Sequence, residues 1–284
     1  MARRSVFIPR DVYPFFEEIH VDFDYFQGFA LSQKRKSQIS LHNNFLKAYP
    51  DYKVLEISSS SLYSLGCALS AMDLKKRTSQ GVTTVESAFQ SSRIYGADCE
   101  IGPFPEYLFL PGKECKKIVK DKSKGLISYH YLFDGMSFSA PTYHISLFYD
   151  YLYLNALCEP ENMETAERLL ESGYNAFTDL ATRALNSQAR SAALFTALTA
   201  NGLIDQVKDY DSYLALFRTG KNGLNTGPES FENVQLLTRK GDVQLLSPVV
   251  PCTFSRAETE NYYKEKCSSL TNRKDPANYL DLLT

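Results

Sequence analysis

Hydrophobic positions recur at helical spacing in the stretch from Gly81 to Gly96, which reads GVTTVESAFQSSRIYG. Val85, Ala88 and Phe89 fall on one side of such a helix, as the buried stripe of an amphipathic helix does. Gly96 supplies a stop, because glycine readily adopts the left-handed conformation that ends a helix. We therefore predict a central helix in this stretch, around which the rest of the chain is organised.

The polar positions of the same stretch allow two interpretations. Thr83 and Glu86 have the S/T-x-x-E spacing of a capping box, in which each side chain bonds the backbone N–H group of the other residue. Glu86, Gln90 and Arg93 also follow one another at i, i+4 and i+7, so an acid, an amide and a guanidinium share one edge of the predicted core. Whether Glu86 is a capping residue or a catalytic acid stays open at this point.

Other segments alternate between extended and helical patterns. Residues 5–30 are rich in aromatic and β-branched side chains, are interrupted by prolines and predict extended segments. A short apolar run predicts a buried strand over 54–57, followed by a polar loop of serines. Helical patterns cover residues 31–45, 145–157, 164–172 and 186–198, and a β-hairpin is predicted from 234–237 and 243–246.

A second group of polar residues gathers before an apolar helix, in YNAFTD (174–179) and NSQARSAALF (186–195). Asn186 or Ser187 is the expected N-cap of this alanine-rich helix. The N-terminus of a helix has free N–H groups and the positive end of the helix dipole, so it favours an anion. We therefore expect the start of this helix to bind a ligand.

Composition adds a few limits. With 284 residues, 44% of them hydrophobic and 23% charged, the chain is long enough for one large globular domain, and its net charge of −2 argues against a general electrostatic nucleic-acid binder. Six cysteines without a C-x-x-C pair and four scattered histidines predict no metal, no cofactor and no disulfide framework. The N-terminus lacks an apolar leader and no run of 18 apolar residues occurs, so we expect a cytoplasmic protein with free thiols and no membrane partner.

Lysines are concentrated in one place. Six of them stand within residues 113–124, opposed by two acids. Either they form the solvated face of an amphipathic helix, or they contact the phosphates of a nucleic acid without reading its sequence. A smaller group, Lys34, Arg35 and Lys36, lies near the start of the predicted helix 31–45 and allows the same two interpretations.

The central stretch resembles a motif of the NADAR (YbiA-like) family. TTVESAFQSSRIYG is similar to the family's T-x-E-H-Y-F-Q-A-x-K-F, with Glu86, Phe89 and Gln90 matching in order. Ser87 and Arg93 stand where the family has His and Lys.

Three further stretches continue this resemblance in the same order. LGCALSAM is similar to the family's y-G-x-F-S-N-F, with Gly66 and Ser70 matching. AFTD is similar to A-x-W-G-D, so Asp179 corresponds to the acid and Phe177 would take over stacking from the missing tryptophan. NSQARSAALF is similar to K-N-R-L-G-x-L-L-M, with Gln188 near the family's Asn.

The motifs span roughly residues 60–200 and leave the N-terminal part and the tail outside. The sequence looks closest to the longer members of the family that accompany DarT-type toxins as antitoxins. This resemblance implies an α+β, predominantly helical fold with a NADAR core and a small sheet. We expect residues 1–218 to form that domain, including the N-terminal extended segments, and residues 219–284 to form a C-terminal extension of hairpin and helix, packed on the core.

The resemblance implies an N-glycosidic hydrolase that removes ADP-ribose from guanine bases of DNA, as an antitoxin or in repair, against a DarT-type ADP-ribosyltransferase encoded nearby. Breaking such a bond passes through an oxocarbenium-like state, which a carboxylate can stabilise while a second group manages the leaving base and the water. Glu86 and Asp179 would form this catalytic pair. Substrate contacts are expected from Gly66, Ser70, Phe89, Gln90, Arg93, Phe177, Gln188, Lys34 and Lys36.

A family member is also implied to carry a lysine a few residues before the glycine motif, which forms a Schiff base with the opened ribose. Counting back from Gly66 leads to Ser60, which is therefore the third catalytic position. A serine hydroxyl there has no adjacent base to activate it. Two alternatives follow, namely a non-catalytic protein that binds ADP-ribose or NAD, and an antitoxin that masks its toxin by direct protein–protein binding.

Overall fold

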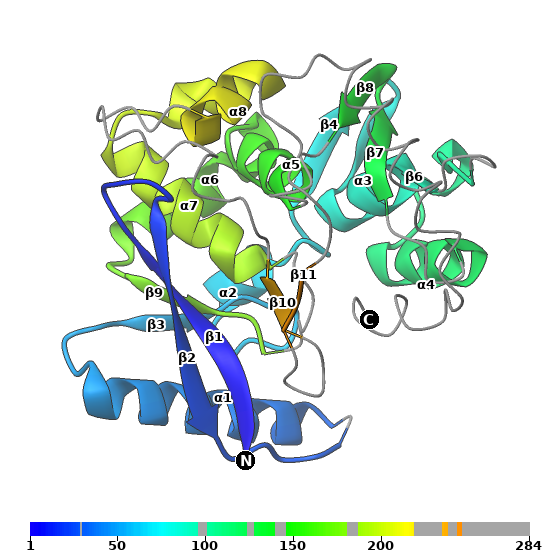
Figure 1. Ribbon diagram of the computed structural model, residues 1–284. Coiled ribbons are helices and arrows are strands. Elements are labelled where there is room, and N and C mark those ends of the chain that lie inside the picture. Colours follow the sequence, from blue (N-terminus) through cyan, green and yellow to red (C-terminus); the bar gives the residue numbers. More distant parts are fainter. Residues whose placement is uncertain are drawn as a thin grey trace.

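The computed structural model describes residues 1–28, 30–95, 101–123, 128–139, 146–180 and 187–218, together with strand residues 235–237 and 243–245 (Figure 1). Helices outweigh strands, and the strands form small sheets. The predicted α+β, predominantly helical fold with a small sheet is therefore confirmed.

Four strands form the main sheet, in the order β2-β1-β9-β3. β1 (Ala2–Pro9) and β2 (Phe16–Phe23) form an antiparallel hairpin, which confirms the predicted N-terminal extended segments. β9 (Ala176–Thr178) pairs antiparallel with β1 and parallel with β3 (Val54–Glu56). The carboxyl ends of β3 and β9 therefore lie side by side at one edge of the sheet, and ligands commonly bind at that end of parallel strands.

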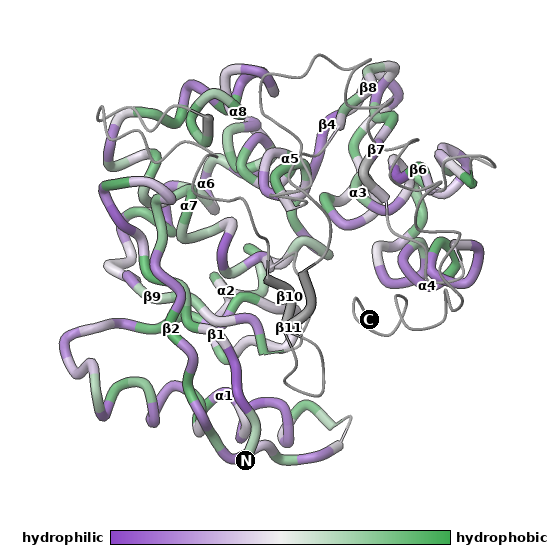
Figure 2. Tube along the Cα trace, in the orientation of Figure 1, coloured by the Kyte–Doolittle hydropathy of each residue, from purple (hydrophilic) through white to green (hydrophobic). Residues whose placement is uncertain are grey.

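Helices cover both faces of this sheet (Figure 1). Successive side chains of a strand point to opposite faces. Val6 accordingly joins the apolar cluster beneath α1 (Leu31–Ala48), while its neighbour Phe7 joins the larger cluster on the other side. That larger cluster includes α7 (Gln188–Ala200) and α5 (Leu147–Leu157), which pack on each other. Figure 2 shows the alternation of hydrophobic and hydrophilic positions along α1, as expected of a helix with one buried face.

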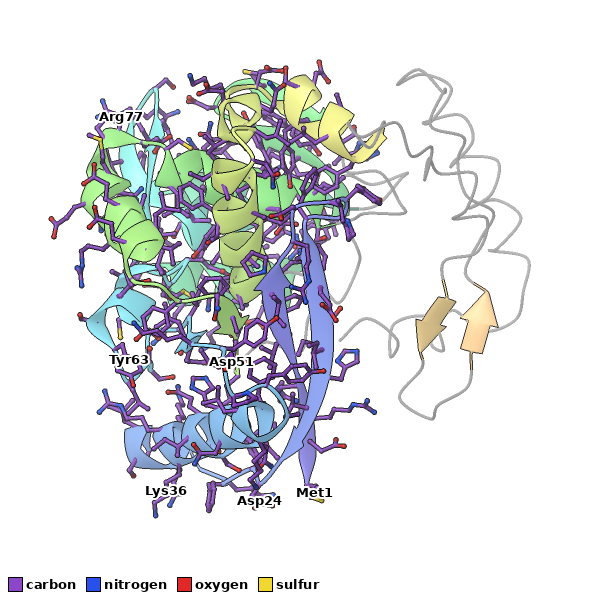
Figure 3. The ribbon with its side chains drawn as sticks, turned by 90° about the vertical axis from the view of Figure 1, so that its left-hand side faces the viewer. Met1, Asp24, Lys36, Asp51, Tyr63 and Arg77 are labelled. Atoms are coloured by element: carbon purple, nitrogen blue, oxygen red, sulfur yellow. The ribbon has the colours of Figure 1, made fainter. Side chains whose placement is uncertain are left out.

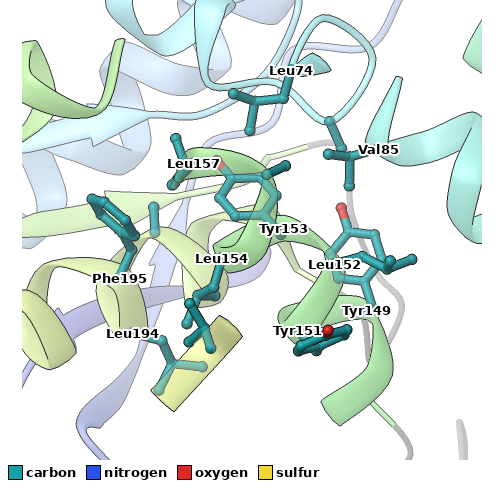
Figure 4. Close-up of a cluster of buried hydrophobic side chains, with 14 of the residues drawn as sticks. Leu74, Val85, Tyr149, Tyr151, Leu152, Tyr153, Leu154, Leu157, Leu194 and Phe195 are labelled. Carbon is teal, nitrogen blue, oxygen red and sulfur yellow. The ribbon is translucent and has the colours of Figure 1, made fainter. Parts of the chain in front are cut away.

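The largest apolar cluster is built around α5, almost all of whose residues are buried (Figure 4). In it, Tyr153 and Leu154 of α5 are joined by Leu194 and Phe195 of α7. The hydroxyl of Tyr153 donates to the carbonyl oxygen of Leu69 at 2.6 Å, which satisfies the polar end of a ring that is otherwise in an apolar environment.

One ion pair is buried between α5 and α7. The Nη2 atom of Arg190 donates to both carboxylate oxygens of Asp150, at 2.9 and 3.1 Å, and the hydroxyl of Ser191 donates to Asp150 at 2.6 Å. A buried carboxylate that is matched in charge and hydrogen-bonded in this way holds two helices in one register.

The predicted helix over residues 81–96 is wrong in its extent. Residues Gly81–Thr84 form β5, which pairs with β4 (Lys75–Thr78), and only Val85–Ser92 form the helix α3. The residues after α3, Arg93–Tyr95, form the strand β6. Three β-branched residues before α3 favour the strand over an earlier helix start. The predicted stop at Gly96 does not apply, because the helix ends before Arg93, and Gly96 itself lies outside the described residues.

The predicted capping box is also wrong by one position. Thr84, not Thr83, is the N-cap of α3, and its hydroxyl oxygen accepts from the backbone N–H of Ser87 at 3.2 Å. The hydroxyl of Thr83 donates to the carbonyl oxygen of Leu108 instead. Glu86 therefore lies in the first turn of α3 without forming the predicted capping box with Thr83.

The remaining elements surround this core. β6 pairs with β7 (Ser128–Phe133), which pairs with β8 (Met136–Ser139). The other helices are α2 (Ser64–Ala68), η1 (Pro105–Tyr107), α4 (Gly112–Ser123), η3 (Pro160–Asn162), α6 (Met163–Glu171), η4 (Ile204–Lys208) and α8 (Tyr210–Arg218).

In the tail, β10 (Gln235–Leu237) and β11 (Val243–Leu245) pair antiparallel, as the predicted hairpin requires. The helix expected in the C-terminal extension and the stretch 219–234 lie outside the described residues. The division of the chain at residue 218 stays a prediction.

Candidate functional site

Glu86 lies in the first turn of α3 and is buried, with 4% of its surface exposed. Its Oε1 atom accepts a hydrogen bond from Nε2 of Gln90 at 3.0 Å and lies 3.1 Å from Nζ of Lys116. Lys116 comes from α4 and is about half exposed, so it links the buried acid to the surface. Sequence reasoning missed this partner, because nothing in the spacing of the lysine run indicates which of its members turns toward α3.

The hydrogen bonds continue along the polar edge of α3. Nη1 of Arg93 donates to Oε1 of Gln90 at 3.3 Å, so Glu86, Gln90 and Arg93 form one connected chain, as their spacing predicts. The guanidinium carbon of Arg93 lies 5.2 Å from the ring centre of Phe89 and 4.8 Å from that of Tyr95. These cation–π contacts hold the arginine at the end of the chain.

Tyr149 of α5 is a buried residue on which both predicted acids act. Burial raises the pKa of the Tyr149 phenol well above 10, and the charges of Glu86 and Asp179 raise it further. Both acids therefore act electrostatically on the same buried phenol, although they are far apart in the sequence. Phe89 packs edge-on against Tyr149, with the ring centres 5.1 Å apart, and so helps to hold the Tyr149 ring in place.

Asp179 follows directly after β9 and is buried beside Glu56, the last residue of β3. Burial raises the pKa of Glu56 to about 8, and the charge of Asp179 adds to this effect. Sequence reasoning missed Glu56. The available signal was a single acid inside the apolar run VLEI, immediately before the serine string and hence at the carboxyl end of a predicted strand.

The serine loop after β3 meets the first turns of α1. The side chain of Gln38 donates to the carbonyl oxygen of Ser60 at 3.2 Å and to its hydroxyl at 3.3 Å, and the Ser58 hydroxyl lies 3.1 Å from that of Ser60. Nη2 of Arg35 donates to the carbonyl oxygen of Ser61 at 3.3 Å. Among the three cations at the start of α1, Arg35 is thus the one that faces this loop.

Lys34 and Lys36 are exposed, and Figure 3 shows Lys36 at the outer surface of α1. The structure does not bring these two lysines together with Glu86 and Asp179 in any contact between described residues. Arg35 belongs to the same group of cations as Lys34 and Lys36. Its contact with the serine loop makes it a functional candidate that the sequence alone did not single out.

Gly66, Ser70 and Gln188 form the framework around the acids. A Cβ atom on Gly66 would lie 2.1 Å from the carbonyl oxygen of Glu56, so only glycine fits where α2 crosses the end of β3. The side chain of Gln188 donates to the carbonyl oxygen of Ile57 and accepts from the backbone N–H of Ala71, both at 2.8 Å. The Ser70 hydroxyl accepts from the backbone N–H of Met72 at 3.3 Å.

The backbone N–H of Glu86 in turn donates to the carbonyl oxygen of Ala71 at 2.9 Å. Gln188 therefore links Ile57, which follows β3, to Ala71, which accepts the hydrogen bond from Glu86. The start of α7 thus lies next to the end of β3 and to the start of α3. Ser187 is the N-cap residue of α7, and Asn186 lies outside the described residues. Phe177 is fully buried within β9, where its ring has no exposed face for stacking on a base.

The lysine run forms the predicted amphipathic helix. Cys115 and Val119 of α4 are buried, while its lysines at 113, 116, 117, 120 and 122 are exposed. Nζ of Lys122 lies over the stacked rings of Phe104 and Tyr107, at 6.0 and 5.5 Å from their centres. Lys124 lies outside the described residues.

Within the described ranges, no group of three or more histidine, cysteine, aspartate or glutamate residues is arranged to hold a metal ion. No helix in the same ranges is long and apolar enough to cross a membrane.

Residues 2–225 match the sequence model of a family described as DarT1-associated NADAR antitoxin. This match covers most of the chain and places it in the NADAR class; the chain belongs to the DarT1-associated NADAR antitoxin family. The matched region includes the N-terminal hairpin and α1, so the resemblance extends beyond the residues 60–200 that the motifs alone covered. A search of curated proteins finds no match.

Proposed function

We propose that this protein is a glycohydrolase that removes ADP-ribose from guanine bases of DNA and acts as the antitoxin of a DarT-type ADP-ribosyltransferase. Its membership of an antitoxin family associated with DarT1 supports the second half of the proposal. The observation that carries the first half is that two buried acids, Glu86 and Asp179, both act electrostatically on the buried phenol of Tyr149.

Two carboxylates suit the cleavage of an N-glycosidic bond. As the bond between the ribose C1 and the guanine nitrogen breaks, positive charge develops on the sugar and one carboxylate stabilises it. The other carboxylate takes a proton from the attacking water and passes it to the guanine, which leaves with the bonding electrons. We assign the sugar side to Asp179, at the end of the sheet, and the water or the leaving base to Glu86, which has Lys116 and Gln90 to hold it.

The remaining contacts suit the rest of the substrate. Arg93, at the end of the chain from Glu86, and Arg35, beside the serine loop, are cations within reach of a diphosphate. The exposed lysines of α4 suit the phosphates of the DNA, and Lys116 among them joins that surface to Glu86.

A non-catalytic binder of ADP-ribose is the second candidate. It is favoured by Ser60, which stands where the family is implied to carry a lysine, and which is held in place by Gln38 and Ser58. Such a protein would retain modified DNA without releasing ADP-ribose.

An oligonucleotide with one ADP-ribosylated guanine tests the proposal. We expect free ADP-ribose and unmodified guanine in the products, measured by mass spectrometry. Retention of the oligonucleotide without release would establish the binder, and absence of both would leave direct masking of the toxin as the antitoxin mechanism.

A further inference from the structure

The two carboxylate oxygens of Glu86 differ in their surroundings. Nε2 of Gln90 donates to Oε1 at 3.0 Å, and Nζ of Lys116 lies 3.1 Å from the same oxygen. Among the residues that the structure describes, none donates a hydrogen bond to Oε2. One oxygen is therefore held by a neighbour on its own helix and by a cation from α4, whereas the other is left to accept a hydrogen bond from a ligand.

The amide of Gln90 has a fixed orientation. Its Oε1 atom accepts from Nη1 of Arg93 at 3.3 Å, so its NH2 group faces Glu86. The reverse orientation would place the NH2 group against the guanidinium, which has only donors. Arg93 in turn lies over the rings of Phe89 and Tyr95, at 5.2 and 4.8 Å from their centres. Gln90 is thus set up to donate to Glu86.

Helix α4 approaches Glu86 closely because its first residue is a glycine. A Cβ atom on Gly112 would lie 3.0 Å from Cβ and 3.3 Å from Cγ of Glu86, and 2.9 Å from Sδ of Met72. A larger residue would therefore push Glu86 or α4 aside. Lys116 stands four residues further along α4, on the same face as Gly112. The close approach at Gly112 thus brings the amine of Lys116 within reach of Glu86.

Ser87, the residue after Glu86, holds α4 in this position. Its hydroxyl donates to the carbonyl oxygen of Leu110, two residues before α4, at 2.7 Å. The buried thiol of Cys115 lies 3.9 Å from the carbonyl oxygen of Ser87. The backbone beside Glu86 and the first turn of α4 are therefore fixed to each other.

Lys116 differs from the other lysines of α4. It is the one described lysine of this helix that forms an ion pair with a described residue. Its side chain is 55% exposed, whereas that of Glu86 is 6% exposed, so the cation lies at the outer end of a buried acid. Burying a carboxylate is costly without a cation nearby, and Lys116 offsets this cost.

We propose that Lys116 is a positioning residue, which together with Gln90 holds Oε1 of Glu86 so that Oε2 is the oxygen that accepts the proton of the attacking water. This role rests on the proposed function. In that step the water oxygen bonds to C1 of the ribose and its proton moves to Oε2. The bond from C1 to the guanine nitrogen breaks, its electrons stay on guanine, and the proton passes from Oε2 to that nitrogen. Gly112 permits the arrangement because it lets α4 lie against Glu86.

The single-turnover rate of ADP-ribose release, measured with enough protein to bind all of the modified oligonucleotide, separates this role from DNA affinity. We expect Lys116→Met to slow release at least about 30-fold, because Oε1 loses one of its two partners and the carboxylate turns. Lys116→Arg should recover the rate to within about threefold, since a guanidinium also supplies a cation. Lys47→Met, which removes one exposed lysine of α1, is the control and should match the wild type.

Two results would overturn the positioning role of Lys116. One is release by Lys116→Met at the wild-type rate once all of the oligonucleotide is bound. The other is a loss in Lys116→Met that Lys116→Arg does not recover, because a cation at this position would then be irrelevant. Lys116 is more than half exposed, so we expect both variants to fold.

Gly112→Ala tests the close approach while Lys116 is kept. The added methyl group would meet both Glu86 and Met72, and we expect release to slow at least about tenfold. Met72→Ala makes room on one side only, so the double variant Gly112→Ala with Met72→Ala should stay slow. Full recovery in the double variant would assign the loss to packing against Met72 and overturn the role of Gly112. If Gly112→Ala does not fold, the Lys116 variants decide the proposal.

The contact itself can be tested without substrate. In protein labelled with ¹³C at the glutamate carboxyl groups, the signal of Glu86 is the one that Glu86→Gln removes. We expect this signal to shift in Lys116→Met and to stay in place in Lys47→Met. An unchanged signal in Lys116→Met would show that the ion pair is absent and overturn the proposal. If the signal shifts while the wild type releases no ADP-ribose, the proposed function fails and the contact between Lys116 and Glu86 stands.

Discussion

Asp150 and Glu56 are both fully buried carboxyl groups, but their surroundings differ. Asp150, between α5 and α7, accepts two hydrogen bonds from Arg190 and one from Ser191. Glu56, at the carboxyl end of β3, accepts hydrogen bonds from neutral donors and has a second acid, Asp179, beside it. Asp150 is thus paired with a cation, whereas Glu56 is hydrogen-bonded by neutral groups and its pKa is raised by burial and by the charge of Asp179.

This difference indicates a structural role for Asp150 and a functional role for the acids at the end of β3. A buried ion pair costs much less than a buried lone charge and makes sense as part of the scaffold. A buried acid whose pKa is raised by burial and by the charge of a second acid is typical of a site that a reaction or a ligand uses. Substitutions at Asp150 and Arg190 should therefore change stability, whereas substitutions of the candidate catalytic acids should change the rate of reaction.

Removing Arg190 from its ion pair with Asp150 should have the largest effect on stability. Arg190→Ala leaves Asp150 buried without its guanidinium, so we expect a loss of about 3–5 kcal/mol in the free energy of unfolding, measured by urea denaturation. The matched control is the double variant Asp150→Leu with Arg190→Met, which should recover most of the loss because it buries no charge. If Arg190→Ala lost less than about 1 kcal/mol, this ion pair would contribute no more than an exposed one, and its role in the scaffold would be contradicted.

Neutralising Glu86 should affect the rate of ADP-ribose release more than stability. In Glu86→Gln the hydrogen bond with Gln90 is preserved and a half-exposed ion pair with Lys116 is lost, so stability should change by less than about 1 kcal/mol. ADP-ribose release should slow by at least about 100-fold, or roughly 2.7 kcal/mol of barrier.

Glu114→Gln is the control for Glu86→Gln, because Glu114 is an exposed acid on α4 beside the same lysines. Its rate should match that of the wild type. A Glu86→Gln variant that also releases ADP-ribose at the wild-type rate would return Glu86 to a purely structural role.

A substitution in the serine loop should increase the rate of ADP-ribose release. Ser60→Lys introduces an amine next to the region of Glu56 and Asp179, where it can attack the opened ribose carbon. We expect release to rise at least about tenfold, or about 1.4 kcal/mol of barrier, together with an adduct that borohydride traps. If the wild type is already fast and the variant is slower, Ser60 is not the position of the nucleophile. Lys34, Lys36 and Lys116 should then be replaced in turn, with Lys116 first because it contacts Glu86.

The lysine face should contribute affinity without chemistry. Reversing the charge of Lys113, Lys117 and Lys120 should lower the salt dependence of oligonucleotide binding by about 2 to 3 in log–log slope and leave the binding of free ADP-ribose unchanged. The control reverses three exposed lysines elsewhere and so has the same net charge: Lys47, Lys75 and Lys208. Equal weakening of both ligands, or of neither, would remove α4 from the DNA-binding surface.

Much of the scaffold follows from local sequence. The apolar spacing and β-branched runs predicted the N-terminal strands, α1, β3, α5, α7 and the strand pair in the tail. The polar edge of α3 was predictable as well, because i, i+4 and i+7 positions meet on any helix. The extent of α3 was not, since the strands on either side of it are specified by partners elsewhere, such as β7 for β6.

The candidate site depends on long-range pairing. Glu56 and Asp179 meet because β3 and β9 pair in parallel, and no local pattern fixes which two strands do so. Lys116 meets Glu86 through the packing of α4 on α3, which sequence spacing does not encode. The family motifs pointed to Glu86 and Asp179 as candidate catalytic residues. Their neighbours Lys116 and Glu56 became apparent only from the tertiary structure.

Asp179→Asn tests most directly the claim that the acids at the end of the sheet carry the chemistry. The measurement is the single-turnover rate of ADP-ribose release from a guanine-modified oligonucleotide, with binding of free ADP-ribose followed in parallel. We predict a rate at least about 100-fold below that of the wild type with ADP-ribose binding retained, because asparagine keeps the shape of the side chain but cannot stabilise positive charge on the sugar. Release by Asp179→Asn at the wild-type rate would contradict the account.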